Sequence, residues 1–164
     1  MELRRPELKD KKTILEMMQE FENETVPHDG GFWSSDSFSY EDWLNVNLNN
    51  EMGFNIPDHF VPSIQFVGFE GDRAIGFLSL RIRLNSALLE KGGHIGYSVR
   101  PSDQGKGYGK NMLSKALPIA RSKGIGEILL TCQTDNAASR SVILANGGVL
   151  ENIIDNCERY WIRE

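Results

Sequence analysis

Cysteine is scarce in this chain of 164 residues, which contains only Cys132 and Cys157. Two isolated cysteines form neither a disulfide framework nor a clustered metal site, so we expect both to be reduced, half-buried strand residues and expect no metal. Long apolar runs are also missing: no stretch suits a membrane span, and Met1–Pro6 does not resemble a signal peptide. The sequence therefore predicts a cytoplasmic protein with no membrane partner.

Positive charge is absent from Thr13 to Asp72, a segment with twelve acidic residues. Residues 1–60 carry a net charge of −8 and residues 61–164 a net charge of +3. This asymmetry favours two ligands of opposite sign, a phosphorylated cofactor and a cationic acceptor such as an amine, although a merely solubilising acidic face is the alternative. No basic stripe is interleaved with aromatic residues, so we do not expect a nucleic-acid partner.

Glycine is concentrated after an apolar strand, in the run Val-Arg-Pro-Ser-Asp-Gln-Gly-Lys-Gly-Tyr-Gly-Lys of residues 99–110. Glycine permits close backbone approach, and a helix N-terminus offers unpaired N–H groups, so this loop suits a phosphate or pyrophosphate. The spacing fails the dinucleotide fingerprint by one residue. It also fails the P-loop pattern, because Gln104 replaces a glycine and Asn111 replaces the magnesium-binding hydroxyl. An ordinary glycine-rich turn is the alternative interpretation.

The length of 164 residues predicts one domain over residues 1–164, and the hydrophobic periodicity predicts the α/β (α+β) class. The predicted strands are residues 1–8, 64–69, 74–83, 94–99, 127–132 and two within 149–164; the predicted helices are 9–24, 40–50, 109–122 and 136–145. Pro118 should bend or break the third helix. The order β-α-α-β-β-β-α-β-α-β-β implies a mixed central sheet of about seven strands flanked by about four helices.

This order, together with Gln104-x-x-Gly107-x-Gly109 placed five residues after Val99, resembles the GNAT superfamily of N-acetyltransferases. The likeness covers nearly the whole chain. Over residues 92–150, the runs Gly-Gly-His-Ile-Gly-Tyr-Ser-Val-Arg-Pro-Ser and Asp135-Asn136-x-x-Ser139 resemble bacterial members of unassigned substrate. The resemblance implies acetyl-CoA as co-substrate and direct attack by an amine in a ternary complex.

The resemblance also implies which residues bind coenzyme A. Backbone groups of Tyr97, Ser98 and Val99 would pair with the pantetheine arm, and the Val99 N–H would polarise the thioester carbonyl. The pyrophosphate would lie on main-chain amides of Gln104, Gly105, Lys106, Gly107, Tyr108, Gly109 and Lys110. Asn136 and Ser139 would touch the lower part of coenzyme A, or would only cap their helix.

The general base is harder to place, because Gly92 and Gly93 occupy the region where many GNAT enzymes carry a glutamate. His94 titrates near pH 6.5 in isolation, which suits a base at neutral pH, so His94 is the candidate catalytic residue. A packed or hydrogen-bonded histidine at a strand end is the alternative.

The general acid is not assigned, because Ile143 stands where relatives often carry a tyrosine. Tyr97 and Tyr160 are conceivable substitutes. A thiol with a pKa of about 8.5 also leaves reasonably well without a dedicated acid.

The acceptor site is expected on the Gly-rich segment between the first two helices, at Glu24, His28, Asp29, Trp33 and Trp43. Carboxylates and aromatic rings hold cations by charge and cation–π contact, although Trp43 could serve only to anchor its helix. The acceptor remains open among a small amine, a peptide N-terminus and a lysine side chain. The oligomeric state is open too, a homodimer included.

Two further functions compete with acetyl transfer. The missing glutamate and tyrosine favour a noncatalytic module that binds or senses acyl-CoA. A phosphotransferase would use the glycine loop for a nucleoside triphosphate, but the absent magnesium-binding hydroxyl argues against it.

Overall fold

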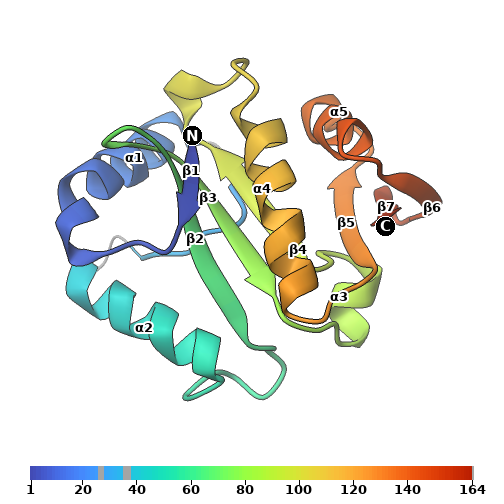
Figure 1. Ribbon diagram of the computed structural model, residues 1–164, viewed down its shortest axis with the longest axis horizontal. Helices are drawn as coiled ribbons and strands as arrows, with labels where there is room; N and C mark the ends of the chain where they lie inside the picture. The colour runs from blue at the N-terminus through green and yellow to red at the C-terminus, as the bar shows by residue number, and fades with distance from the viewer. Residues whose placement is uncertain (26–27, 35–37, 164) are drawn as a thin grey trace.

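The computed structural model describes residues 1–25, 28–34 and 38–163. Within them the chain forms seven strands, five α-helices and two short 3₁₀ helices (Figure 1). The strands are β1 (Glu2–Arg4), β2 (Ser63–Glu70), β3 (Arg73–Arg81), β4 (Ile95–Val99), β5 (Ile128–Gln133), β6 (Val149–Ile154) and β7 (Cys157–Ile162). The helices are η1 (Leu8–Asp10), α1 (Lys11–Glu24), α2 (Tyr40–Met52), α3 (Ser86–Glu90), η2 (Pro101–Asp103), α4 (Tyr108–Ser122) and α5 (Ala137–Ala145).

The strands form two sheets, with the orders β1-β2-β3-β4 and β5-β7-β6. The sheets meet only at the beginning of β4, within the described residues: the His94 N–H donates to the Leu129 carbonyl at 2.8 Å, and a single β-bridge joins Gly93 to Leu130. Figure 1 shows β4 and β5 running in the same direction and separating beyond this junction. The two sheets therefore form a fork whose open end lies at the end of β4.

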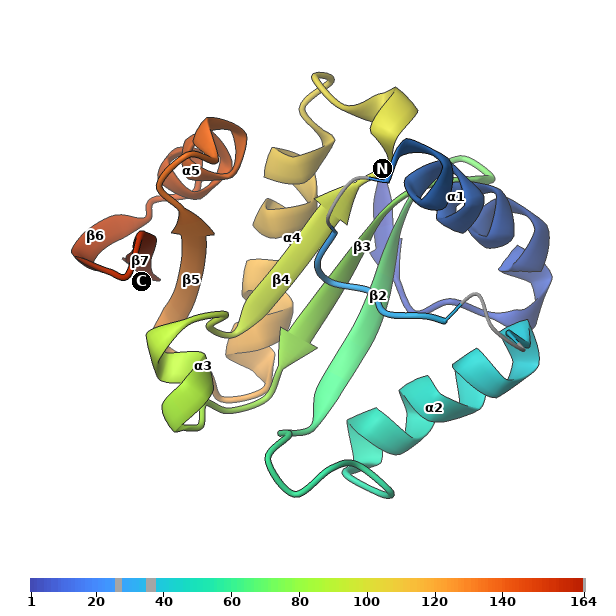
Figure 2. The same cartoon turned by 180° about the vertical axis from the view of Figure 1, so that it is seen from behind.

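Helices cover both faces of the four-stranded sheet. Helix α4 lies on one face, and its buried side packs with residues of both sheets in one hydrophobic cluster. Helices α1 and α2 lie on the other face, where Met17, Met18 and Trp43 pack against β2 and β3 (Figure 2). All three side chains are buried in the core. Trp43 therefore anchors its helix, which is the alternative role considered for it in the sequence.

All seven predicted strands are present, but they are divided between two sheets of four and three strands instead of forming one continuous sheet. Sequence periodicity missed α3, which has only five residues and no buried side chain; the Asn85 side chain caps it by accepting from the Leu88 N–H at 2.9 Å. Helix α4 continues without a break through Pro118. No helix in the described part of the chain has the length and apolar character to cross a membrane.

The junction between the sheets depends on Gly93, whose φ is +65° and whose Cα faces the Leu129 carbonyl so closely that a Cβ would lie 2.3 Å from that oxygen. We expect Gly93→Ala to lower the free energy of unfolding by more than about 3 kcal/mol, because backbone must move to relieve the clash. Gly71→Ala is the matched control: its φ is +58° but nothing lies within 4 Å. Gly71→Ala should lower the free energy of unfolding, measured in urea, by only about 1 kcal/mol. Equal losses in the two variants would show that the junction is not tightly packed.

Candidate active site

Within the described residues, β4 is the edge strand of its sheet, so one side of its backbone faces the fork without a neighbouring strand. The Arg81 N–H donates to the His94 carbonyl and the Arg100 N–H to the Ile75 carbonyl, each at 2.7 Å. Because hydrogen-bonding direction alternates along an antiparallel strand, Gly96 and Ser98 also face β3, whereas Tyr97 and Val99 direct their N–H and C=O groups toward β5. The structure thus places Tyr97 and Val99 where an extended ligand could add as another strand.

Ser98 is oriented differently from its two neighbours. Its backbone pairs with Phe77 of β3, and its hydroxyl contacts Asp29 on the face opposite α4. The predicted contact between Ser98 and the pantetheine arm stays a prediction that this orientation does not favour.

The glycine loop ends at the N-terminus of α4, next to the open end of the fork. Gly107 is the N-cap residue, has a φ of +85° and has no side chain to occupy the first N–H groups of the helix. A Cβ on Gly105 or Gly107 would meet nothing within 4 Å, so this backbone is open to an approaching group. The helix N-terminus and the exposed Lys110 make the loop electropositive, as an anion site requires.

The loop is held from outside by charged contacts that the sequence did not indicate. Glu20 of α1 accepts from the Arg100 Nε at 2.6 Å and from the Ser102 N–H at 2.5 Å. Buried Asp103 accepts from Arg73 at 3.0 Å and from Lys106 at 3.1 Å. Lys106 is therefore paired within the loop, and the Gln104 amide donates to the Val99 carbonyl at 3.3 Å. These contacts preorganise the loop; the only clue in the sequence was a charged Arg100 directly after an apolar strand.

Helix α5 forms the opposite wall of the fork. The Asn136 side chain caps this helix by accepting from the Ser139 N–H at 3.1 Å. The Ser139 hydroxyl lies 3.0 Å from the Tyr97 hydroxyl, so β4 and α5 are linked across the space between the sheets. Burial raises the pKa of Tyr97 to about 12, and its hydroxyl keeps its proton at neutral pH. Ile143 is fully buried in the core and offers no group to a ligand.

A buried polar cluster attaches α5 to the three-stranded sheet. Arg140 binds both carboxylate oxygens of Glu158, at 2.8 and 2.9 Å, and thereby lowers the pKa of Glu158 to about 2. The Tyr160 hydroxyl donates to the same carboxylate at 2.7 Å. Burial raises the pKa of neighbouring Cys132 to about 12, which argues against a nucleophilic thiolate there. Both Tyr160 and Cys132 thus belong to the support of α5.

His94 lies at the junction of the sheets and is 6% exposed. Its Nδ1 accepts from the Leu129 N–H at 3.0 Å. Burial, with a smaller effect of the Arg81 charge, lowers the pKa of His94 from 6.5 to about 4. The ring is therefore neutral at pH 7 and uses one nitrogen to join the sheets, which is the structural role considered above; its catalytic role stays a prediction.

Residues 28–34, between α1 and α2, cross the face of β3 and β4 opposite α4 (Figure 2). Asp29 and Gly30 lie directly on β4: a Cβ on Gly96 would meet the Asp29 carboxylate at 2.5 Å, and one on Gly30 would meet the Gly96 carbonyl at 2.5 Å. The Ser98 hydroxyl accepts from the Asp29 N–H at 2.6 Å and donates to the Asp29 carbonyl at 2.7 Å. The predicted acceptor segment is thus held against the strand that borders the fork.

The other predicted acceptor residues differ in their placement. His28 stacks on Trp33 with ring centroids 4.3 Å apart, and the Trp33 indole N–H donates to Glu22 at 2.8 Å. Glu24 is exposed at the end of α1, and Trp43 is buried with its indole N–H on the Phe32 carbonyl. Of the five candidates, Asp29 lies against β4, whereas His28 and Trp33 pack beside Phe21 of α1 and Trp33 also lies beside Phe77 of β3.

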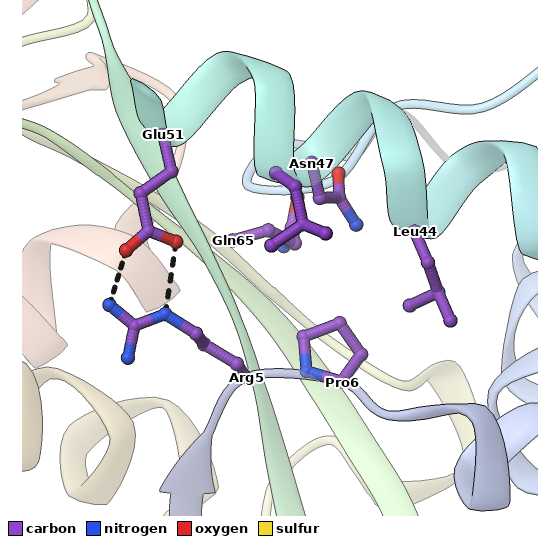
Figure 3. A pocket seen from close by; sticks show the side chains of 7 residues that line it. Arg5, Pro6, Leu44, Asn47, Glu51 and Gln65 are labelled. Carbon is purple, nitrogen blue, oxygen red and sulfur yellow. Dashed lines mark hydrogen bonds and ion pairs between the residues drawn. The ribbon is translucent and has the colours of Figure 1, made fainter. Parts of the chain in front are cut away.

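A separate pocket of about 140 Å³ lies between α2 and β2 (Figure 3). Arg5, Pro6, Leu44, Asn47, Leu48, Glu51 and Gln65 line it. The Arg5–Glu51 ion pair closes one side, and the Gln65 amide donates to the Gly30 carbonyl at 2.6 Å. Since β2 is two strands from β4, this pocket is distinct from the fork, although Gln65 helps to hold the acceptor segment.

Solved structures with the same fold include several acetyltransferases. A PaiA N-acetyltransferase of Thermoplasma acidophilum, crystallised with coenzyme A, has 21% identity and a TM-score of 0.63, covering 99% of this chain and 98% of its own. A Salmonella typhimurium acetyltransferase that modifies the N-terminal serine of ribosomal protein L7/L12 has 16% identity, a TM-score of 0.70 and coverages of 99% and 94%.

A chimera of the Vibrio cholerae spermidine N-acetyltransferase SpeG and hSSAT has 19% identity, a TM-score of 0.63 and coverages of 99% and 96%. No curated protein matches the chain. The sequence itself matches the acetyltransferase (GNAT) family over residues 15–147, which span most of the fork and the glycine loop. This chain therefore belongs to the GNAT acetyltransferase family.

Proposed function

We propose that the protein transfers an acetyl group from acetyl-CoA to a primary amine by direct attack in a ternary complex. The observation that carries the proposal is the pair of backbone units on β4 that face away from β3, those of Tyr97 and Val99, which lead to the open N-terminus of α4. Structural neighbours act on amines, among them spermidine and the N-terminal serine of a ribosomal protein, which supports an amine acceptor.

The chain's own groups fit the cofactor. Coenzyme A supplies an acyl group activated as a thioester. Tyr97 and Val99 would bind its pantetheine arm through backbone N–H and C=O groups, one N–H polarising the carbonyl under attack. The amides from Gly105 to Lys110 would bind the pyrophosphate, and Asn136 and Ser139 would border the cofactor from α5. Because Glu20 and Asp103 already hold the loop in shape, little ordering accompanies binding.

The proton transfers depend on groups around β4. His94 was predicted as the base, but it is buried at the junction with a lowered pKa. With Ile143 buried, the protonated Tyr97 hydroxyl would be the proton donor, which is supported by its position 3.0 Å from the Ser139 hydroxyl of α5. The same two observations favour the second candidate function, a module that binds acyl-CoA without catalysis.

A thiol-release assay separates the two functions. With acetyl-CoA and a set of amines including spermidine and a peptide with a free N-terminal serine, we expect release of free thiol that depends on at least one amine. Saturable coenzyme A binding without turnover of any amine would favour the binding module.

The cofactor assignment is tested by Gly107→Glu, which adds bulk and negative charge where the pyrophosphate is expected. We expect coenzyme A binding to fall below detection by calorimetry while the fold persists. Gly124→Glu is the control: Gly124 follows the same helix, with a φ of +86° against +85° at Gly107, and neither has an atom within 4 Å of its Cβ. Backbone strain is thus matched, and equal affinities in the two variants would remove the glycine loop as the binding site.

The role of His94 is tested by its titration. Because its folded pKa of about 4 is below the ordinary 6.5, only the unfolded chain gains a proton between these values. Stability should be unaffected above pH 6.5 and fall as the pH decreases, by about 2 kcal/mol between pH 7 and pH 5. His94→Asn keeps a hydrogen-bond acceptor near the position of Nδ1. In denaturant unfolding, its free energy of unfolding should therefore not show this decrease of about 2 kcal/mol between pH 7 and pH 5. An unchanged decline, with kcat lost at pH 7, would instead support His94 as the base.

A further inference from the structure

One carboxylate oxygen on the acceptor side of β4 is left free. Oδ1 of Asp29 accepts from the Gly30 N–H at 2.7 Å and lies 3.5 Å from the Arg81 guanidinium. Oδ2 has no hydrogen-bond partner among the described residues, and the side chain is 49% exposed. Asp29 therefore combines a fixed oxygen with an available one.

The position of this carboxylate is determined by backbone contacts. Gly96 has no Cβ, so the carboxylate rests on the peptide that precedes Tyr97, whose N–H faces the fork. The two hydrogen bonds of the Ser98 hydroxyl, to the N–H and the carbonyl of Asp29, fix the Asp29 backbone on β4. The free oxygen thus lies beside the strand that presents the proposed thioester-binding groups, on the face not covered by α4.

Other titratable groups nearby are already engaged. Arg81 donates to the Gly92 and Gly93 carbonyls at 3.0 and 3.2 Å. These bonds hold its guanidinium in place beside the junction of the sheets. His94 has its Nδ1 on the Leu129 N–H, and Glu22 accepts from the Trp33 indole. Glu22 also keeps one oxygen outside its Trp33 bond, but Glu22 lies on α1, whereas the Asp29 carboxylate lies directly against Gly96 of β4.

We propose that Asp29 binds the ammonium group of the acceptor through Oδ2 and takes one proton from it. This inference rests on the proposed acetyl transfer and names its base. The neutral nitrogen then forms a bond to the thioester carbon as the carbon–sulfur bond breaks. A second nitrogen proton goes to the departing sulfur, and Asp29 returns its proton to solvent. The acceptors would be primary alkylammonium groups, and carboxylates would be repelled.

Asp29→Asn tests the binding step, because an amide oxygen can keep the Gly30 hydrogen bond while the charge is lost. The probe is propylammonium added to the protein saturated with coenzyme A, followed by the backbone NMR signals of Gly30 and Gly96. We expect saturable shifts in the unsubstituted protein and affinity weakened about 10-fold or more in the variant, as for a lost charged hydrogen bond. Asp58→Asn is the control, since Asp58 is exposed in the same acidic segment and its loss changes the net charge equally. No shift in the unsubstituted protein, or equal effects of the two variants, would overturn the proposal.

Turnover tests the proton transfer separately. At saturating amine, Asp29→Asn should lower kcat on the order of 100-fold, whereas affinity for coenzyme A and the melting temperature should change little. A rise in KM with unchanged kcat would overturn the base role of Asp29. Propylammonium binding that needs Asp29, with no turnover of any amine, would instead overturn the proposed acetyl transfer and leave only an ammonium site.

Discussion

The separation of β4 from β5 is the constraint on which the rest of the site depends. Two sheets that continued to pair would satisfy every backbone group of β4 and leave no edge for a ligand. In the described part of the chain their backbones are joined where Gly93 and His94 meet Leu129 and Leu130, and they then diverge. Because of that geometry, the backbone of Tyr97 and Val99 pairs with no second strand. The proposed chemistry and the stability of the fold therefore both depend on this junction.

In the proposed reaction, the two sides of β4 would serve different partners, because its side chains and its backbone point in different directions. The backbone of Tyr97 and Val99 faces the fork, whereas Gly96 and Ser98 support the segment that carries Asp29. Cofactor and acceptor groups can thus approach one strand without competing for the same atoms. Rigid support on both sides reduces the ordering that each ligand must impose, and it favours reaction by proximity.

Local patterns in the sequence were sufficient to predict the strands, the long helices and the glycine loop, because hydrophobic periodicity and glycine spacing are local properties. The five-residue α3 has no buried face and left no such pattern. The Glu20–Arg100 contact joins residues 80 positions apart, and spacing carries no information about that pairing. His94 illustrates the same limit: its residue type suited a base, but its pKa is decided by burial between two sheets, which only the fold reveals.

The excess of acidic residues in the first part of the chain does not by itself create an attractive field for a cation. Several of those carboxylates are paired with distant cations: Glu20 with Arg100, Glu41 with Lys11, and Glu51 with Arg5. Exposed pairs and solvent screening reduce their effect at a distance. Selection of the proposed cationic acceptor would therefore depend on a carboxylate within contact distance. The free oxygen of Asp29 meets that requirement, since it lies against β4 and retains a hydrogen-bonding position for an incoming ammonium group.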